Sequence, residues 1–407
     1  MKLVEINTVN GTGSTGKIAI SLYKLAESDG NEPYIAYGRG KSPVGIRSFK
    51  IGNMADFGIH VLSNFILGNS GFASRVVTKR FLKWLDNIQP DLLHLHNLHG
   101  FYIHIGMLFD YIKNRNIPVI MTLHDCWTFT GQCSHFDYIS CDKWKKQCFS
   151  CPIYRSDYPY SLFRDNSRHN YRNKKEAFSN IPKMIIVTPS NWLSNLVKQS
   201  FLKNYYITTI YNGIDLDLFK PTKPNLDRTI NYSTIKNKKI LLGVANVWTN
   251  KKGYEFFLKL ADILDDSFHI VLIGVNKNQH KKLSHHYSDK ITSIIRTNNQ
   301  KELAQWYTIA HAFINPTLED NFPTTNLEAL ACGTPVITFN TGGSPESITE
   351  TCGIVVEKGN LSKLKEAIIS LPNNNMITSE SCRRQALKYN KDILFEEYLG
   401  LYKKILS

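Results

Sequence analysis

The residues best suited to do chemistry gather in one stretch, NPTLEDNFPTTNLEALACGTPV at 315–336. We expect a strand to end at Pro316 and, after a loop of small polar residues, a helix to begin near Thr325 or Asn326 with Glu328 on its first turn. Backbone N–H groups of such a loop can hold a diphosphate at the carboxyl end of a sheet. Glu328 could then accept hydrogen bonds from a ribose diol. Its alternative role is to stabilise the helix N-terminus, a contribution of about 0.3–1 kcal/mol.

Another candidate phosphate-binding segment is the glycine-rich turn GTGSTGK at 11–17, which follows the first predicted strand and opens a helix. Here Gly13 and Gly16 would let the backbone approach a donor phosphate. The spacing fits the dinucleotide fingerprint, but the second strand ends in Arg39 where an NAD enzyme has a carboxylate. The stretch also nearly matches a P-loop, except that Ile18 replaces the hydroxyl that binds magnesium. A tight strand-to-helix turn is the purely structural alternative.

Histidines mark the ends of two further strands. His124 closes the strand predicted at 118–125, on the side where ligands meet an α/β sheet, although a histidine there is often only a packing residue. The segment HLHNLHG at 94–100 adds three more. We expect His94 and His96 on opposite sides of their strand and predict no metal site there.

Five of the eight cysteines lie within 26 residues, and in a reducing compartment such a cluster favours metal over disulfides. Four of them, separated by seven, six and two residues, predict one structural zinc site: Cys133, Cys141, Cys148 and Cys151. His135 could replace one ligand, and free thiols or two disulfides are the alternatives. The fifth, Cys126, is expected to be a buried small hydrophobe.

Short apolar runs alternate with helical stretches along the chain, which is typical of parallel α/β sheets. The predicted strands are 3–7, 33–38, 91–96, 118–125, 184–190, 238–245, 268–274, 311–317 and 334–339. Between 212 and 237 the pattern lapses into Asn, Asp, Lys and Pro, as in an interdomain connection. We therefore predict two doubly wound Rossmann-like domains, at 1–216 with a Cys-rich insertion at 126–152 and at 217–407, the last helix packing back on the first domain.

Composition narrows the class of protein. The 407 residues are 42% hydrophobic and 20% charged, and no run reaches the roughly 20 apolar residues that span a bilayer. The N-terminus becomes polar too early for a signal peptide, so we expect a cytoplasmic protein. A formal charge of +15 favours an anionic partner.

The 315–336 stretch resembles the GT-B glycosyltransferases of family 4, the group with many bacterial capsule, exopolysaccharide and lipopolysaccharide enzymes. Those enzymes carry two acidic residues separated by seven others. The second acidic residue is the Glu of a Glu-Ala pair, which is followed by a small residue, Gly and Pro-Val. Asp320 and Glu328 hold the acidic positions here, and Ala329, Gly333 and Pro335 continue the match. The resemblance implies that Glu328 binds the donor ribose and that Asp320, one methylene shorter than the usual Glu, lies near the transferred sugar.

The resemblance extends along the chain through VTPSNWL at 187–193, YNGID at 211–215 and TGGSPESI at 341–348. In the family, an Arg followed closely by Lys-Gly binds the donor phosphates. Here Lys252 before Gly253 matches the Lys and Lys251 is adjacent, but the Arg is missing. The resemblance also implies that His124 faces the transferred sugar across an interdomain cleft. With Glu328 and the two lysines, the loop completes the expected donor site: Asn321, Phe322, Pro323, Thr324 and Thr325.

The resemblance implies a retaining glycosyltransferase that moves a sugar from a nucleoside diphosphate to a glycan acceptor, in this group commonly lipid-linked, without a catalytic metal. A GT-B nucleotide-sugar 2-epimerase is the alternative, and a zinc-stabilised nucleic-acid-binding protein is less favoured because no basic recognition helix is found. Residues 57–85 combine apolar residues at helical spacing with Arg75, Lys79, Arg80 and Lys83. They predict attachment to the anionic inner face of the membrane, with an ordinary core helix as the alternative.

Overall fold

The computed structural model describes residues 1–223 and 235–407, so part of the connection expected at 212–237 lies outside the described residues. The chain forms two compact units. The first comprises Met1–Tyr211 with Phe395–Ser407, and the second comprises Asn212–Leu394. Each unit has its own sheet and its own core, and each is described by itself.

Seven parallel strands form the sheet of the first unit within the described residues, in the order β3-β2-β1-β4-β5-β6-β7. Their bounds are β1 Lys2–Val9, β2 Glu32–Arg39, β3 Ser48–Lys50, β4 Leu92–Leu95, β5 Val119–Thr122, β6 Met184–Thr188 and β7 Tyr206–Thr209. Strands β4, β5 and β6 are buried along their whole length, because helices cover both faces of a parallel sheet.

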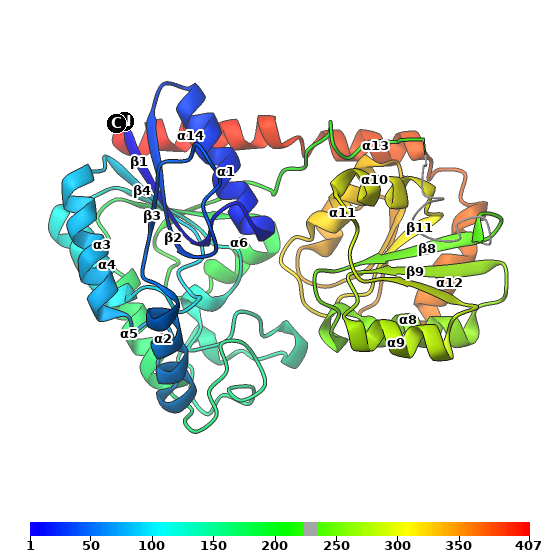
Figure 1. The fold of residues 1–407 in the computed structure, drawn as a ribbon, viewed down its shortest axis with the longest axis horizontal. Helices are drawn as coiled ribbons and strands as arrows, with labels where there is room; N and C mark the ends of the chain where they lie inside the picture. Colours follow the sequence, from blue (N-terminus) through cyan, green and yellow to red (C-terminus); the bar gives the residue numbers. More distant parts are fainter. Residues whose placement is uncertain (224–234) are drawn as a thin grey trace. The chain divides into compact units, whose positions relative to one another are not determined.

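Six helices of the first unit lie before Tyr211, where the chain leaves this unit. They are α1 Gly13–Ser28, α2 Met54–Leu67, α3 Arg75–Ile88, α4 Ile105–Arg115, α5 Ser167–Phe178 and α6 Asn191–Val197. Figure 1 shows α3 and α4 on one side of the sheet and α1 on the other. Between β5 and α5 the chain has only three short 3₁₀ helices, η1 Trp127–Phe129, η2 Asp137–Ile139 and η3 Lys143–Lys145. This irregular segment carries the clustered cysteines.

Six parallel strands form the second sheet within the described residues, in the order β10-β9-β8-β11-β12-β13. The strands are β8 Lys239–Val244, β9 Phe268–Ile273, β10 Ile291–Ile294, β11 Ala312–Asn315, β12 Val336–Phe339 and β13 Gly353–Val356. The main helices are α8 Tyr254–Ile263, α9 Lys277–His286, α10 Gln300–Ile309, α11 Thr324–Ala331, α12 Leu361–Ser370 and α13 Ser379–Leu387. Helices α8 and α9 lie on the opposite face of the sheet from α10 and α11 (Figure 1).

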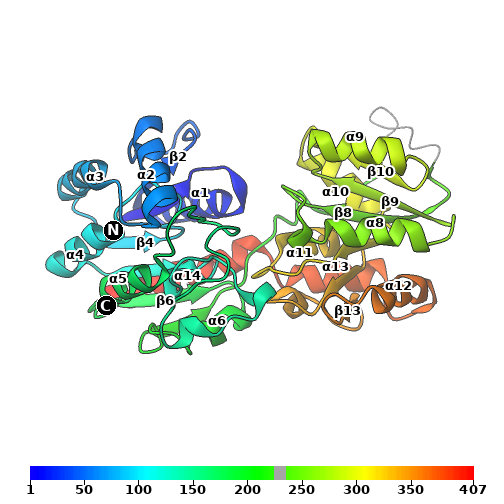
Figure 2. The same cartoon turned by 90° about the horizontal axis from the view of Figure 1, so that it is seen from below.

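The last helix, α14 Lys391–Leu406, starts in the second unit and ends in the first. Its terminal turns run along the first unit in both views (Figures 1 and 2). Two of its tyrosines enter that unit's interior, where the Tyr402 hydroxyl lies 2.7 Å from His94 Nδ1 and the Tyr398 hydroxyl 3.3 Å from Thr122 Oγ1.

The fold class predicted from the sequence is confirmed, since both sheets are parallel and are wound outward in both directions from a central pair of strands. All nine predicted strands are present. The sequence missed the four strands β3, β7, β10 and β13.

Candidate functional site

The second sheet reverses its strand order between β8 and β11, and ligands of open α/β sheets bind beyond the carboxyl ends of strands at such a point. Two segments leave the sheet there. Residues 245–253 follow β8 and include the 3₁₀ helix η4 Asn250–Lys252, and residues 316–323 follow β11.

Two lysines of the first segment pair with two acids of the second. Lys252 Nζ lies 2.6 Å from Asp320 Oδ2, and Lys251 Nζ lies 3.2 Å from Glu319 Oε2. The Leu318 N–H also donates to the Lys251 carbonyl at 2.7 Å. The structure thus brings together three residues that the sequence analysis singled out, Lys251, Lys252 and Asp320.

Glycines allow the backbones around this cluster to approach one another. Gly253 has a φ of +83°, and a Cβ there would lie 2.3 Å from the Pro316 carbonyl oxygen. Gly342 has a φ of +56°, and a Cβ there would lie 1.7 Å from the Asp320 carbonyl oxygen. The adjacent Gly343 N–H donates to the Asn321 carbonyl at 2.8 Å. The family-like Thr-Gly-Gly turn therefore supports the loop that carries Asp320 and Asn321.

Helix α11 begins at Thr324 directly after Pro323, and the N–H groups of its first turn, including those of Thr324 and Thr325, have no partner within the helix. It begins one or two residues earlier than the predicted start at Thr325 or Asn326, so Glu328 lies on the second turn and not on the first. The electrostatic effect of a helix terminus fades within one turn, which weakens the purely stabilising role of Glu328.

A buried tyrosine orients Glu328. The Tyr307 hydroxyl donates to Glu328 Oε2 at 2.9 Å, and burial together with the Glu328 charge raises the pKa of Tyr307 well above its ordinary value. The hydroxyl therefore keeps its proton and remains a donor. Glu328 itself is half-buried, so a carboxylate held from inside the protein still reaches the surface.

His124 lies in the first unit, two residues beyond the end of β5. His124 Nε2 is 3.1 Å from His96 Nδ1, and His96 Nε2 is 3.2 Å from Glu5 Oε2. Burial lowers the pKa of His124 to about 4, so the ring is neutral at pH 7. At that pH His124 can hold a hydroxyl but does not carry a positive charge.

The prediction that His94 and His96 lie on opposite sides of a strand is wrong. Residues two apart in a strand share a face, and the two ring centroids are 4.1 Å apart. Among the described residues, one group of three His, Cys, Asp or Glu side chains has all its potential metal-ligand atoms within 4.8 Å of one another. It consists of Glu5, His94 and His96. Both ring nitrogens of His94 are hydrogen-bonded to hydroxyls, those of Tyr402 at 2.7 Å and Thr122 at 2.8 Å, which assigns His94 a structural role.

Asp125, beside His124, organises the start of the irregular segment. Its carboxylate lies 2.8 Å from His99 Nε2 and accepts from the Trp127 N–H at 2.8 Å. Burial acts to raise the pKa of Asp125, but His99 and the other donors lower it to about 2, so the carboxylate is ionised.

Gly13 and Gly16 lie at the other switch point, where β1 leads into α1 in the first unit. A Cβ on Gly16 would lie 3.1 Å from the Gly11 nitrogen and 3.2 Å from Val9 Cγ2, tighter than an ordinary contact, so close packing of the turn favours a glycine there. Gly13 has a φ of +65° and faces open space. The Gly16 contacts favour the tight-turn interpretation over a phosphate contact at that residue.

Sequence reasoning missed several residues of these sites. Glu319 is 7% exposed in its side chain and pairs with Lys251, although only its neighbour Asp320 was considered. Glu5 and Tyr307 are buried partners of the predicted residues, from separate segments. The alternation of polar and apolar residues in VEIN and LLHLH was an available signal for Glu5 and His96, because every second residue shares a face.

Two family models match nearly the whole chain in succession. The model described as Glycosyltransferase Family 4 matches residues 19–218, and the model described as Glycosyl transferases group 1 matches residues 227–389. The matched ranges follow the two units.

Curated relatives are similar along different shares of the chain. WcaC from Escherichia coli strain K12, whose name assigns it provisionally to colanic acid biosynthesis as a glycosyl transferase, is 22% identical over 100% of both chains. The N,N'-diacetylbacillosaminyl-diphospho-undecaprenol alpha-1,3-N-acetylgalactosaminyltransferase of Campylobacter jejuni is 24% identical over 57% of this chain and 63% of its own.

Solved structures share the fold at low identity. Sucrose-phosphate synthase from Thermosynechococcus elongatus aligns over 100% of this chain and 99% of its own, with a TM-score of 0.72 and 15% identity. Anabaena HepE in complex with UDP aligns over 99% of this chain and 100% of its own, with a TM-score of 0.68 and 13% identity. The epimerase alternative finds no support in these matches. From the two parallel sheets, Asp320 on the β11 loop with Glu328 on α11, and the two successive family matches, we conclude that the chain is a GT-B glycosyltransferase belonging to family 4.

Proposed function

We propose that this glycosyltransferase moves a sugar from a nucleoside diphosphate to a lipid-linked glycan acceptor, with retention at the anomeric carbon, in surface polysaccharide biosynthesis. The observation that carries the donor half of the proposal is the arrangement at the β8–β11 switch point. There two lysines, the N-terminus of α11 and an oriented glutamate converge on one edge of the sheet.

Glu328 is assigned to the ribose of the donor. A carboxylate accepts hydrogen bonds from two neighbouring hydroxyls, and Tyr307 holds one of its oxygens from the interior. The diphosphate is assigned to the N–H groups of Thr324 and Thr325 at the start of α11 and to Lys252 and Lys251.

Lys252 can serve the diphosphate at small cost. Its ammonium is 42% exposed and the Asp320 carboxylate is 22% exposed, and such a partly solvated ion pair contributes at most about 1 kcal/mol. The cation is therefore already held at the loop and can be shared with an incoming anion. This arrangement supplies the positive charge that the leaving group needs, so we propose that turnover requires no added Mg²⁺.

In the proposed reaction the bond between the anomeric carbon and the diphosphate oxygen breaks, and the acceptor oxygen bonds to the same face of that carbon. The acceptor proton passes to the leaving diphosphate oxygen, the nearest base on that face. No covalent bond to the enzyme is formed. We assign Asp320 and the neutral His124 to hydroxyls of the transferred sugar.

The acceptor half of the proposal is supported by helix α2. This helix buries the polar residues His60 and Asn64 and exposes apolar ones, with Ile59 65% exposed and Leu62 59% exposed. The next helix, α3, exposes a row of basic side chains: Arg75, Lys79, Arg80 and Lys83. No helix among the described residues is long and apolar enough to cross a membrane.

We propose that α2 and α3 hold the enzyme on an anionic membrane surface, where an acceptor with a lipid anchor resides. Part of α2 packs against the unit through Phe57 and Phe65, but its most exposed apolar side chains, Met54, Ile59 and Leu62, support a membrane contact over an ordinary core helix. The Campylobacter relative, by its name, acts on a sugar linked to diphospho-undecaprenol, which supports an acceptor of this class.

The donor assignment predicts that Glu328→Ala weakens nucleoside diphosphate binding about 10- to 100-fold. The variant loses hydrogen bonds to a charged group, worth about 1.5–3 kcal/mol. Isothermal titration calorimetry with UDP, GDP and ADP, without Mg²⁺, would measure the loss for whichever base binds. A matched control is Glu357→Ala, which removes an exposed carboxylate of the same unit that pairs with Lys363.

Unchanged affinity in a folded Glu328→Ala protein, shown by an unaltered circular dichroism spectrum, would refute the ribose assignment. Turnover of labelled sugar nucleotides in the wild type that depends strictly on Mg²⁺ would refute the assignment of the leaving-group charge to lysines and N–H groups.

A further inference from the structure

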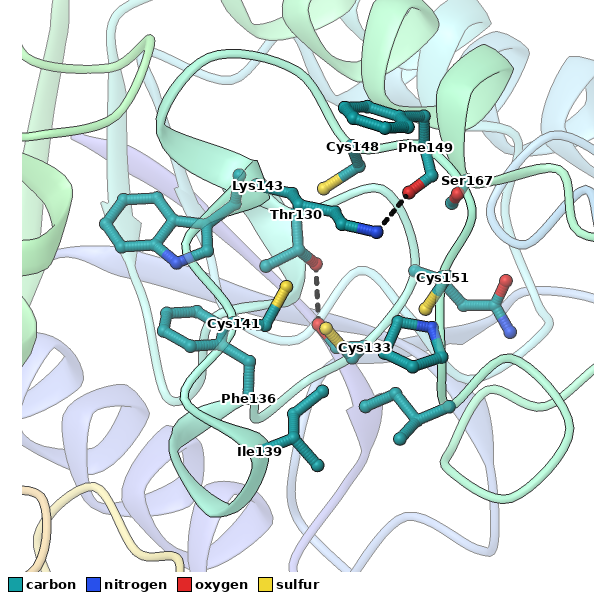
Figure 3. Close-up of a pocket in the computed structure, with 14 residues that line it drawn as sticks. Thr130, Cys133, Phe136, Ile139, Cys141, Lys143, Cys148, Phe149, Cys151 and Ser167 are labelled. Carbon is teal, nitrogen blue, oxygen red and sulfur yellow. Dashed lines mark hydrogen bonds between the residues drawn. The ribbon is translucent and has the colours of Figure 1, made fainter.

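Four cysteines of the irregular segment between β5 and α5 line one small cavity in the first unit (Figure 3). They are Cys133, Cys141, Cys148 and Cys151, and none of the eight cysteines of the chain, all within the described residues, forms a disulfide. The cavity measures about 20 Å³, room for a single water-sized sphere. His135, the alternative ligand considered from the sequence, is not among the residues that line it.

The backbone already donates to one of these sulfurs. The Gly131 N–H points at Cys148 Sγ with a nitrogen-to-sulfur distance of 3.1 Å. Gly131 also has to be a glycine, because a Cβ there would lie 2.6 Å from Cys148 Cβ and 2.3 Å from the Ser167 carbonyl oxygen. Backbone N–H groups that donate to a metal-bound sulfur stabilise the thiolate form of the ligand.

Two lysines lie beside the cavity. Lys143 lines it and donates to the carbonyls of Phe149 and Ser150, at 3.1 Å and 2.8 Å, which fixes the CFSC turn against η3. Lys174 is fully buried, donates to the Trp127 carbonyl at 2.7 Å and lies 3.5 Å from the Trp127 ring centroid. A buried ammonium is costly unless anions compensate it, and the groups whose negative charge acts on Lys174 are the Asp125 carboxylate and the thiolate forms of Cys133 and Cys148.

We propose that Cys133, Cys141, Cys148 and Cys151 bind one Zn²⁺ ion in a closed, structural site. Four thiols bind one Zn²⁺, four S–H bonds break and four Zn–S bonds form, and four protons leave to solvent. The product carries a net charge of −2, which Lys174 and Lys143 offset. No oxidant is needed.

The choice of zinc follows from the ligand set. Four thiolates favour a tetrahedral, soft-ligand ion, and zinc is the common redox-inert choice. No three of the four sulfurs have all their mutual distances within 4.8 Å, so the sulfurs must draw together around the ion. Their segment can make this adjustment, because it contains only short 3₁₀ helices between β5 and α5.

The site would fix the irregular segment next to the candidate sugar-binding residues. Cys126 follows Asp125 directly, is fully buried as predicted, and its N–H donates to the Ser134 carbonyl at 2.8 Å. Cys133 is therefore tied to the strand end that carries His124 and Asp125. All four coordination positions are occupied by protein, so the ion has no direct role in catalysis.

The test uses the full-length chain without a histidine tag, purified in a reducing buffer with no added metal. Elemental analysis should find one zinc per chain. Replacement by Co²⁺ should give the strong visible absorption of tetrahedral cobalt thiolate. The Cys148→Ser, Cys151→Ser double variant should lose both signals, whereas the Cys332→Ser, Cys352→Ser double variant, which alters two buried cysteines of the second unit, should keep both.

Three outcomes would overturn the site. They are a folded wild-type protein with no metal that also takes up no Co²⁺, zinc retained in the Cys148→Ser, Cys151→Ser variant, and two disulfides in place of four reactive thiols. If that variant fails to fold, chelator titration of the wild type decides, because removal of a structural zinc should expose four additional thiols and lower the melting temperature. Donor binding in the second unit is read out separately, so this test does not depend on the proposed reaction.

Discussion

At the scale of residues, the position of His124 depends on side chains that lie deeper in the first unit. Burial raises the pKa of Glu5 well above its ordinary value, so Glu5 is neutral and can donate its proton to His96 Nε2. His96 then donates from Nδ1 to His124 Nε2. This order of donors leaves the proton of His124 on Nδ1, and the chain thus sets the tautomer of His124 from inside.

If His124 holds a hydroxyl of the transferred sugar, His124→Ala should lower kcat about 10²-fold while the Kd for the nucleoside diphosphate changes little. Steady-state kinetics and calorimetry on the same preparation separate the two effects. Glu5→Gln should keep most of the activity, because its amide N–H still donates to His96. Equal losses of kcat and nucleotide affinity in His124→Ala would contradict the division of roles between the two units.

Single residues also show where sequence reasoning reaches its limit. Glu328 could be found because a strand-to-loop-to-helix pattern precedes it, whereas Asp320 and Lys252 were found because they match positions of the family pattern. The Lys251–Glu319 pair could not, because the two residues are 68 positions apart and neither departs from the composition of an exposed loop. Contacts between loops of different strands depend on the strand order, which a single sequence does not encode locally.

At the scale of elements, all four missed strands, β3, β7, β10 and β13, are the edge strands of their sheets. An edge strand has a neighbour on one side only and is partly solvated, as in the half-exposed sequences of β3 and β7. It therefore lacks the continuous apolar run by which the central strands were predicted. The central strands position the sites, which is why the sites were found although the sheets were incomplete.

Helix α2 is predicted to be a membrane contact. Wild-type protein should float with liposomes of anionic lipid at low salt, and less so at high salt. Each basic residue near an anionic surface contributes about 1 kcal/mol, so Lys79→Ala with Arg80→Ala should weaken binding about 30-fold.

Ile59→Ser with Leu62→Ser should also reduce flotation, because both apolar side chains are exposed on α2. Ile369→Ser, which alters an exposed apolar residue of the second unit, serves as the matched control. If the wild type does not bind anionic liposomes even at low salt, the membrane contact is wrong.

At the scale of the whole molecule, the buried histidines of the first unit should make it sensitive to acid. Burial lowers the pKa of His60 and of His94 to about 3, and both side chains are fully buried. Between pH 3 and the unfolded value of about 6.5 the unfolded chain binds more protons, so stability falls as the pH falls. The slope is at most about 1.4 kcal/mol per pH unit for each histidine.

Hydrogen exchange followed by mass spectrometry at pH 7, 6 and 5, corrected for the intrinsic exchange rate, would resolve this effect by unit. Peptides from β4 and β5 should lose protection on acidification. His60→Asn and His94→Asn should each flatten the dependence in any variant that still folds. Protection that does not change between pH 7 and pH 5 would show that these rings are not buried in the neutral form.

Helix α14 makes the second unit an insertion within the first. The chain leaves the first unit after Tyr211, builds the second, and returns with Phe395, and the returning helix supplies Tyr398 and Tyr402 to the first interior. A protein cut at residue 211 would leave His94 and Thr122 buried without these hydroxyls. Exchanging the second unit among relatives therefore requires two junctions, with 212–394 moved as an internal segment and the final helix left with the first unit.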